Sequence, residues 1–308
     1  MGATAELLEI TDLIVDWDPV TLERRPIHRA TVVARLRGLG QAGAAKLVEK
    51  LPERNGILDE AQIDALFVRA HSELQRLEEE FLQGERVRSL LWPLLEVLRE
   101  AKVPGPYRVV DVGCGLGYVT RWLAARGTLG GDVELYGCDY NRALITAASE
   151  AARAENLRCE FKVANAFRLA DPATIFTSSG FIHHFRGDHL PRVFAEQDTA
   201  GAQGLLHFDI KRSWLAPIGA WLFHESRMRE AIARHDGTLS AIRAHSAPTL
   251  LSAARAGAPG LRFTLFDGKV GPLPILRTMQ ALVGVRPAFV EALRLKLGAD
   301  AHRLGSFG

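Results

Sequence analysis

Residues 109–117 read Val-Val-Asp-Val-Gly-Cys-Gly-Leu-Gly, and this stretch decides the fold. An apolar run ends in a turn that carries Gly113, Gly115 and Gly117, and a helix-like segment, 118–125, follows at once. Glycine lacks a Cβ, so the chain can turn sharply there and a ligand can approach its backbone closely. The pattern predicts a strand, a tight loop and a helix.

A second apolar run, 133–138, ends in Asp139. An acid at this distance from a glycine loop is typical of a nucleoside-binding β-α-β unit, in which it accepts the ribose hydroxyls. The alternative is a tight strand-to-helix turn without a ligand. The strand before the loop, the helix after it and the acid at the next strand end all favour a cofactor site.

The residue after the last glycine indicates which cofactor. A dinucleotide fingerprint would have glycine at position 118, where this chain has Tyr118. The spacing is instead G-x-G-x-G, with Asp111 two residues before the first glycine. Over residues 107–280 the chain resembles the class I S-adenosylmethionine-dependent methyltransferases. The resemblance implies that the glycine loop passes under the methionine half of S-adenosylmethionine and that Asp139 holds the ribose.

The same resemblance implies an adenine contact after the third strand, at Asn165-Ala166-Phe167. Asparagine stands where the family usually has an acid; its side-chain carbonyl still accepts a hydrogen bond, although it is also a common turn residue. Tyr140 and Phe167 are expected to lie against the adenine. The cofactor-binding candidates are Asp111, Gly113, Cys114, Gly115, Gly117, Asp139, Tyr140, Asn165, Ala166, Phe167 and Ser179.

Composition describes an ordinary globular chain of 308 residues, 47% hydrophobic and 24% charged, with a formal net charge of +2. So small a charge does not favour nucleic acid as a partner. The three cysteines match no zinc pattern, and their odd number argues against a disulfide framework. The N-terminus does not resemble a signal peptide, and no apolar stretch predicts a spanning helix. We expect a cytoplasmic protein without a membrane partner and without a bound metal.

From residue 107 onward, strand and helix patterns alternate, which predicts an α/β fold: a Rossmann-like, seven-stranded, mostly parallel sheet with helices on both faces. The expected strands are 108–112, 133–138, 159–163, 175–179, 205–210, 261–266 and 274–278, the last two forming a hairpin. The expected core helices are 119–126, 142–156 and 190–197.

Residues 1–104 read as a helical extension, with helices at 41–51, 59–81 and 86–102, and residues 105–308 read as the methyltransferase core. The extension could act as a lid or as the contact of a homodimer. A helical cap is expected at about 211–256. This segment has aromatic residues and seven Lys or Arg against three Asp or Glu, a composition that suits a planar acceptor with a carboxylate or phosphate. The alternative is that its arginines lie on a solvated helix face.

Three residues are candidates for catalysis. His183 and His184 follow the fourth core strand, where the resemblance places the methyl acceptor, and histidine titrates near neutral pH. Their alternative role is structural. Asp209 ends an apolar run, and a buried carboxylate needs a partner. It could act as a base or orient a histidine; the simpler prediction is a salt bridge to Lys211 or Arg212.

The sequence therefore predicts methyl transfer to a small-molecule acceptor, with oxygen favoured over nitrogen or carbon because of the paired histidines. Three alternatives remain open: a methyltransferase for tRNA or protein, a non-catalytic protein with a cofactor fold, and a nicotinamide-dependent oxidoreductase. Tyr118 disfavours the oxidoreductase.

Overall fold

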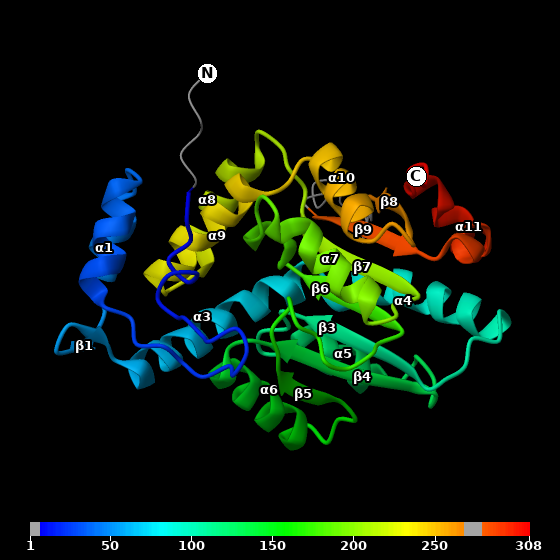
Figure 1. Ribbon diagram of the computed structural model, residues 1–308, viewed down its shortest axis with the longest axis horizontal. Helices are drawn as coiled ribbons and strands as arrows, with labels where there is room; N and C mark the ends of the chain where they lie inside the picture. The colour runs from blue at the N-terminus through cyan, green and yellow to red at the C-terminus, as the bar shows by residue number, and fades with distance from the viewer. Residues whose placement is uncertain (1–6, 268–278) are drawn as a thin grey trace. The chain divides into compact units, whose positions relative to one another are not determined.

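A computed structural model describes residues 7–267 and 279–308, and its centre is a seven-stranded sheet in the order β5-β4-β3-β6-β7-β9-β8 (Figure 1). Only the pairs β7–β9 and β8–β9 are antiparallel. The strands are β3 (Tyr107–Val112), β4 (Val133–Asp139), β5 (Glu160–Val163), β6 (Ile175–Ser179), β7 (Gly204–Ile210), β8 (Arg262–Phe266) and β9 (Met279–Val285). The predicted fold class is confirmed.

The first five strands of this sheet begin and end within one residue of their predicted bounds. The runs of β3, β6 and β7 are almost wholly buried, as strands covered on both faces must be, whereas the edge strand β5 has no buried residue. The predicted strand at 261–266 corresponds to β8. The predicted strand at 274–278 lies outside the described residues, and the described partner of β8 begins at Met279.

Helices cover both faces of the sheet. On one face lie α4 (Gln83–Glu100), α5 (Tyr118–Arg126) and α11 (Val290–Leu297), whose leucines and valines share a core with β3, β7 and β9. On the other lie α7 (His189–Thr199) and α10 (Ala247–Gly257), with Phe176, Phe194 and Phe263 at their contact. Helix α6 (Arg142–Ala154) packs beside β4 and β5.

The order of strands reverses between β3 and β6. From β3 the chain runs outward to β4 and β5, and then returns to β6 on the other side of β3. The carboxyl ends of β3 and β6 therefore flank a crevice, which is where open α/β sheets bind their ligands. The glycine loop follows β3 directly at this point.

The chain forms two compact units, and their boundaries differ from the expected ones. Unit 2 comprises Leu77–Arg212 and Ala244–Gly308; unit 1 comprises Met1–Arg76 and Ser213–Arg243. The expected division at 104–105 put α4 in the extension. Helix α4 belongs to unit 2 because its apolar face is buried in the sheet core, so closely that a Cβ on Gly204 of β7 would lie 2.5 Å from Leu94.

Unit 1 joins the start of the chain to the late insertion. Its helices are α1 (Arg29–Gly38), α2 (Ala42–Val48), most of α3 (Glu60–Glu80), α8 (Ala216–Arg227) and α9 (Ala231–Arg243), and a short hairpin joins β1 (Glu53–Arg54) to β2 (Ile57–Leu58). The third helix of the expected cap, α10, belongs to unit 2. None of the helices within 7–267 and 279–308 has the length and apolarity to cross a lipid bilayer.

Buried polar contacts hold unit 1 together. The carboxylate of Asp236 on α9 accepts hydrogen bonds from the backbone amides of Ile10 and Thr11, at 3.0 and 2.8 Å. Arg243 on the same helix donates to Asp12 at 2.8 Å. The first described residues are thus attached to an element more than two hundred positions away in sequence.

We expect Asp236→Ala to lower the free energy of unfolding by about 2 kcal/mol, since charged hydrogen bonds to buried amides contribute roughly that much. Urea denaturation would measure the loss, and hydrogen exchange at Ile10 and Thr11 would locate it. Asp171→Ala is the matched control, because Asp171 forms an exposed ion pair with Lys162. Equal effects of the two substitutions would contradict the assigned role of Asp236.

Candidate functional site

The glycine loop joins β3 to α5 in a conformation that glycine adopts readily. Gly113, Gly115 and Gly117 have φ angles of 71°, 54° and 70°. The amides of Gly113 and Cys114 both donate to the carbonyl of Cys138, at 2.8 and 3.0 Å. These bonds attach the loop to the end of β4, the neighbouring strand.

Packing imposes a second requirement for two of these glycines. A Cβ on Gly113 would lie 2.2 Å from Cδ2 of Phe181, and one on Gly117 would lie 2.2 Å from Cε1 of Phe161. Phe161 comes from β5 and Phe181 follows β6. The sequence argument attributed these glycines to the approach of a ligand; the structure shows that aromatic side chains of the protein occupy the space beside them.

Asp139 links the end of β4 to the glycine loop. Its Oδ2 accepts the amide of Gly115 at 3.1 Å and its Oδ1 accepts the amide of Asn141 at 2.9 Å. Asn141 then begins α6, where its side chain accepts the amide of Ala143. Both carboxylate oxygens thus bond to backbone amides, which fix the position of Asp139.

Asp111, at the start of the loop, is buried with incomplete hydrogen bonding. Its Oδ2 accepts the hydroxyl of Thr120 at 3.3 Å, whereas its Oδ1 has no hydrogen-bond partner within the described ranges. Burial, and to a smaller extent the neighbouring charge of Asp139, raises the pKa of Asp111 to about 7. A buried carboxylate with an unused oxygen indicates a missing donor.

These residues fit S-adenosylmethionine. Its ribose offers hydroxyl donors to Asp139, and its methionine half offers an ammonium group, which is the type of donor that the unused oxygen of Asp111 lacks. The glycine loop itself, residues 113–117, has no basic side chain for a pyrophosphate. The donor set agrees with a cofactor that carries positive charge.

The residues expected near the adenine lie at the ends of β4 and β5. Tyr140 is 37% exposed directly after Asp139. The side chain of Asn165 accepts the amide of Phe167 at 2.9 Å and so forms a local turn. Half-buried Ala166 packs against the apolar core, and Phe167 contacts Phe185 edge to face. The turn role of Asn165 is observed, and its adenine contact stays a prediction.

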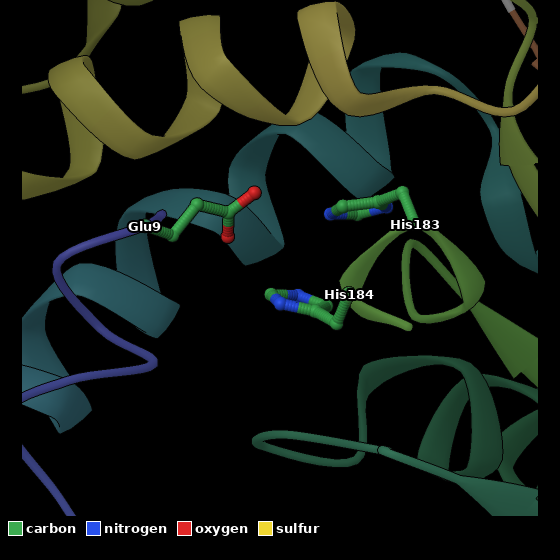
Figure 2. A group of neighbouring side chains, drawn as sticks. All are labelled: Glu9, His183 and His184. Atoms are coloured by element: carbon green, nitrogen blue, oxygen red, sulfur yellow. The ribbon is translucent and has the colours of Figure 1, made fainter. Parts of the chain in front are cut away.

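His183 and His184 lie together in a short turn after β6, and Figure 2 shows their rings one above the other. The ring centroids are 4.4 Å apart. Nδ1 of His183 is 2.8 Å from Oδ1 of Asp209, and the backbone amide of His183 donates to Oδ2 at 2.8 Å. The turn and the end of β7 therefore hold an imidazole on a carboxylate.

The simpler prediction for Asp209, a salt bridge to Lys211 or Arg212, is wrong. Lys211 donates to Asp267 at 2.8 Å, while Asp209 pairs with His183. Successive residues of a strand point to opposite faces. The partner of Asp209 is decided, however, by which side chain can reach it, and the turn that carries His183 packs against the end of β7. A partner close in space but distant in sequence was not visible from spacing.

Hydrogen bonds keep Asp209 ionised. Burial alone would raise its pKa, but the charge and hydrogen bond of His183 and the amides of Ile210 and His183 outweigh burial and lower the pKa overall. An ionised carboxylate only accepts, so Nδ1 of His183 carries the proton in this pair.

The other buried histidine beside this strand end has a structural role. His207 of β7 lies between Ser178 and Gln197, with both ring nitrogens 2.8 Å from their partners. Burial lowers the pKa of His207 to about 3, so the ring is neutral. His207 was not among the residues singled out from the sequence, because the mostly apolar run of β7 does not indicate a role for it.

Two polar residues of the expected cap are used within unit 1. Buried Arg243 donates to Asp12, and Nδ1 of His235 is 2.7 Å from Asp236. Trp214 and Trp221 remain exposed. His245 belongs to unit 2, where Arg186 contacts it at 2.7 Å.

The sequence analysis also missed Glu78. It lies in the last turn of α3, within unit 2. Burial, then the charge of Asp111, raises the pKa of Glu78 to about 8. Its place in the run Glu78-Glu79-Glu80 is typical of a solvated helix end, so only the fold identifies it.

Comparison with known proteins places the glycine loop in a family. Residues 109–200 match a family described as "Methyltransferase domain". Over 143 residues the chain is 31% identical to trans-aconitate 2-methyltransferase of Pseudomonas aeruginosa. The matched segment covers 45% of this chain and 48% of that protein. The chain thus spans about half the length of this curated relative.

Solved structures with similarity include a SAM-dependent methyltransferase from Aquifex aeolicus, at 14% identity and TM-score 0.42, covering 67% of this chain and 98% of that one. Another is magnesium protoporphyrin IX methyltransferase from Synechocystis PCC 6803 with bound SAH, at 14% identity and TM-score 0.43, covering 84% and 99%.

The conformation of the loop predicts different costs for two substitutions at the ends of α5. Gly127→Ala should lower the free energy of unfolding by about 1–2 kcal/mol, because Gly127 has a positive φ of 60°. The space beside Gly127 is open, so its methyl group meets no other atom. Gly117→Ala should lower the free energy of unfolding by about 1–3 kcal/mol more than that, since the methyl group of the alanine would meet Phe161. Chemical denaturation would compare them; equal losses would contradict the packing argument.

Proposed function

Since residues 109–200 make this chain a member of the class I S-adenosylmethionine-dependent methyltransferases, we propose that it transfers the cofactor's methyl group to an oxygen of a small-molecule acceptor. S-adenosylmethionine supplies an electrophilic methyl group and leaves as S-adenosylhomocysteine. The buried pair of His183 and Asp209 carries the choice of oxygen. The other residues of the site bind and orient.

Two acids and the loop would hold the cofactor. Asp139 would accept the ribose hydroxyls, and Asp111 would face the methionine half. The contacts that fix Asp139 are backbone amides, so its position does not depend on the ligand. A preformed site of this kind loses little conformational entropy on binding.

His183 would act as the general base. A hydroxyl acceptor must lose a proton as its oxygen attacks the methyl carbon, and Nε2 of His183, the ring nitrogen that does not face Asp209, would accept that proton. Asp209 is a positioning residue: it fixes the ring and the tautomer, and its charge stabilises the imidazolium that forms. His184, whose ring lies 4.4 Å from that of His183, would contribute to the wall of the acceptor site.

A small-molecule acceptor agrees with two observations. The formal net charge of +2 provides no strong attraction for nucleic acid. The curated relative is named for trans-aconitate, a small molecule. The expected acidic, planar acceptor, the homodimer through the N-terminal helices and the cytoplasmic location remain predictions.

Asp139→Ala should weaken the binding of S-adenosylmethionine by about 1–3 kcal/mol, the usual effect of losing a charged hydrogen-bond partner. Isothermal titration calorimetry would measure the change, with Asp171→Ala as the control on an exposed carboxylate. Wild-type protein that does not bind the cofactor would exclude the enzymatic proposal. Unchanged affinity in the variant would exclude the ribose role alone.

His183→Ala should lower kcat by about 10²–10⁴-fold, the usual contribution of a general base, while affinity for S-adenosylmethionine stays within a few fold. Asp209→Asn should lower kcat as well and should shift the pH profile, because the amide no longer fixes the tautomer. Mass spectrometry of a panel of hydroxylated and carboxylated acceptors, trans-aconitate included, would detect methylated products. If His183→Ala retains full turnover, His183 is not the base.

A further inference from the structure

Helix α8 of unit 1 and the two residues before it expose large apolar side chains to solvent. Each of these side chains is more than half exposed, and that of Trp214 is 80% exposed. The residues are Trp214, Leu215, Ile218, Trp221 and Leu222. Intervals of three, four and seven residues place most of them along one side of the helix. We call this set of residues the α8 face.

The opposite side of α8 is already occupied by its contact with α9 (Figure 1). His224 is the buried residue of α8, and a Cβ on Gly237 of α9 would lie 2.1 Å from Nε2 of His224. Nδ1 of His224 is 2.6 Å from the carbonyl oxygen of Ala220. An ordinary surface helix buries its apolar residues and exposes its polar ones. Helix α8 has the reverse arrangement, which is typical of a surface that binds a partner.

Exposed arginines lie at both ends of the α8 face. Arg212 lies two residues before Trp214, Arg227 is the last residue of α8, and Arg229 follows two positions later. A short helix with tryptophan and leucine on one side and basic residues beside them is typical of segments that lie in the interface of a lipid bilayer. The arginines would then meet the phosphates of anionic lipids.

The acids beside these arginines are paired within unit 1. Glu225 of α8 forms an ion pair with Arg234 at 3.4 Å, and Glu230 forms one with Arg69 at 2.6 Å. Each of these pairs has no net charge. The arginines at the two ends therefore give the surroundings of the α8 face an excess of positive charge, and a partner with negative charge complements it.

This charge pattern disfavours a second copy of the chain as the partner. A two-fold interface brings the same patch of both subunits together. If two α8 helices packed antiparallel, Arg227 and Arg229 of one copy would approach Arg212 of the other, and like charges would repel. A lipid surface that contains anionic headgroups presents negative charge to both ends at once.

We propose that the α8 face docks the protein reversibly on an anionic lipid surface, a role that goes beyond methyl transfer and does not depend on it. The two tryptophans suit this position, because an indole ring has an apolar body and a polar N–H and is enriched at the membrane–water interface. The sequence predicted no membrane partner because no apolar stretch is long enough to span a bilayer. A helix of 12 residues that lies in the plane of the interface needs no such length.

The test measures binding of the full chain to lipid vesicles by co-sedimentation. One set of vesicles is phosphatidylcholine alone, and the other contains equal parts of phosphatidylcholine and phosphatidylglycerol. Leu295 of α11, which is also exposed, provides the control for loss of an apolar side chain, and exposed Arg158 provides the control for loss of a charge. A thermal unfolding curve of each variant without vesicles verifies folding.

We expect the double variant Trp214→Ser, Trp221→Ser to bind the mixed vesicles about tenfold more weakly than the wild type, because less apolar surface enters the lipid. Leu295→Ser should resemble the wild type, since Leu295 lies outside the α8 face.

The double variant Arg212→Gln, Arg229→Gln should lose about fivefold in binding to the mixed vesicles for each arginine, and much less on phosphatidylcholine alone. Added salt should weaken binding of the wild type to the mixed vesicles, because it screens the same attraction. Arg158→Gln should have no effect.

Three results would overturn the inference. The first is wild-type protein that does not bind the mixed vesicles. The second is a loss in Leu295→Ser as large as that in the tryptophan variant, which would indicate general hydrophobic adsorption. The third is a wild-type dimer that the tryptophan substitutions convert to a monomer in sedimentation velocity while vesicle binding is unchanged, which would assign the α8 face to a second copy.

Discussion

The site depends on the burial of carboxylates at the carboxyl ends of parallel strands. A charge removed from water must be matched by donors or by opposite charge, or it is neutralised by a proton. Asp139 is matched by two backbone amides, and Asp209 by an imidazole and two amides. Asp111 receives one hydroxyl and keeps one oxygen without a donor.

The acids differ in how completely the protein satisfies the hydrogen-bonding capacity of their oxygens, and this difference separates their roles. The acids whose oxygens are occupied by the protein are held in place before any ligand arrives. The acid that is incompletely matched is the one from which a ligand gains most on binding, because its charge is uncompensated in the free protein.

Much of the fold could be predicted because each central strand is a short apolar run between turn residues, and such runs are local in sequence. The glycine loop and Asp139 were predictable for the same reason. The role of α4 was not, because a helix with one apolar face can pack on any core, and only the fold shows that Gly204 of β7 leaves room for its Leu94.

Residues of the candidate site could be predicted where they directly follow a strand in sequence. They could not be predicted where their role depends on a partner from a distant part of the sequence. The histidine turn was recognised from its place after β6, but its pairing with Asp209 depends on the packing of that turn against β7. Glu78 illustrates the limit further, since a glutamate in a run of three is expected to be solvated. The burial that raises its pKa is a product of tertiary structure alone.

His183 and His207 show how strand position sets the chemistry of one residue type. His207 lies within β7, two residues before Asp209 and on the same face of the strand, where neutral partners occupy both ring nitrogens. Burial there holds its pKa at about 3, and it cannot accept a proton from a substrate near neutral pH. His183 reaches the end of the same strand from a neighbouring turn, where Asp209 supplies the charge that an imidazolium requires. The proposed proton transfer therefore depends on the place of Asp209 near the carboxyl end of β7, where the turn that carries His183 can reach it.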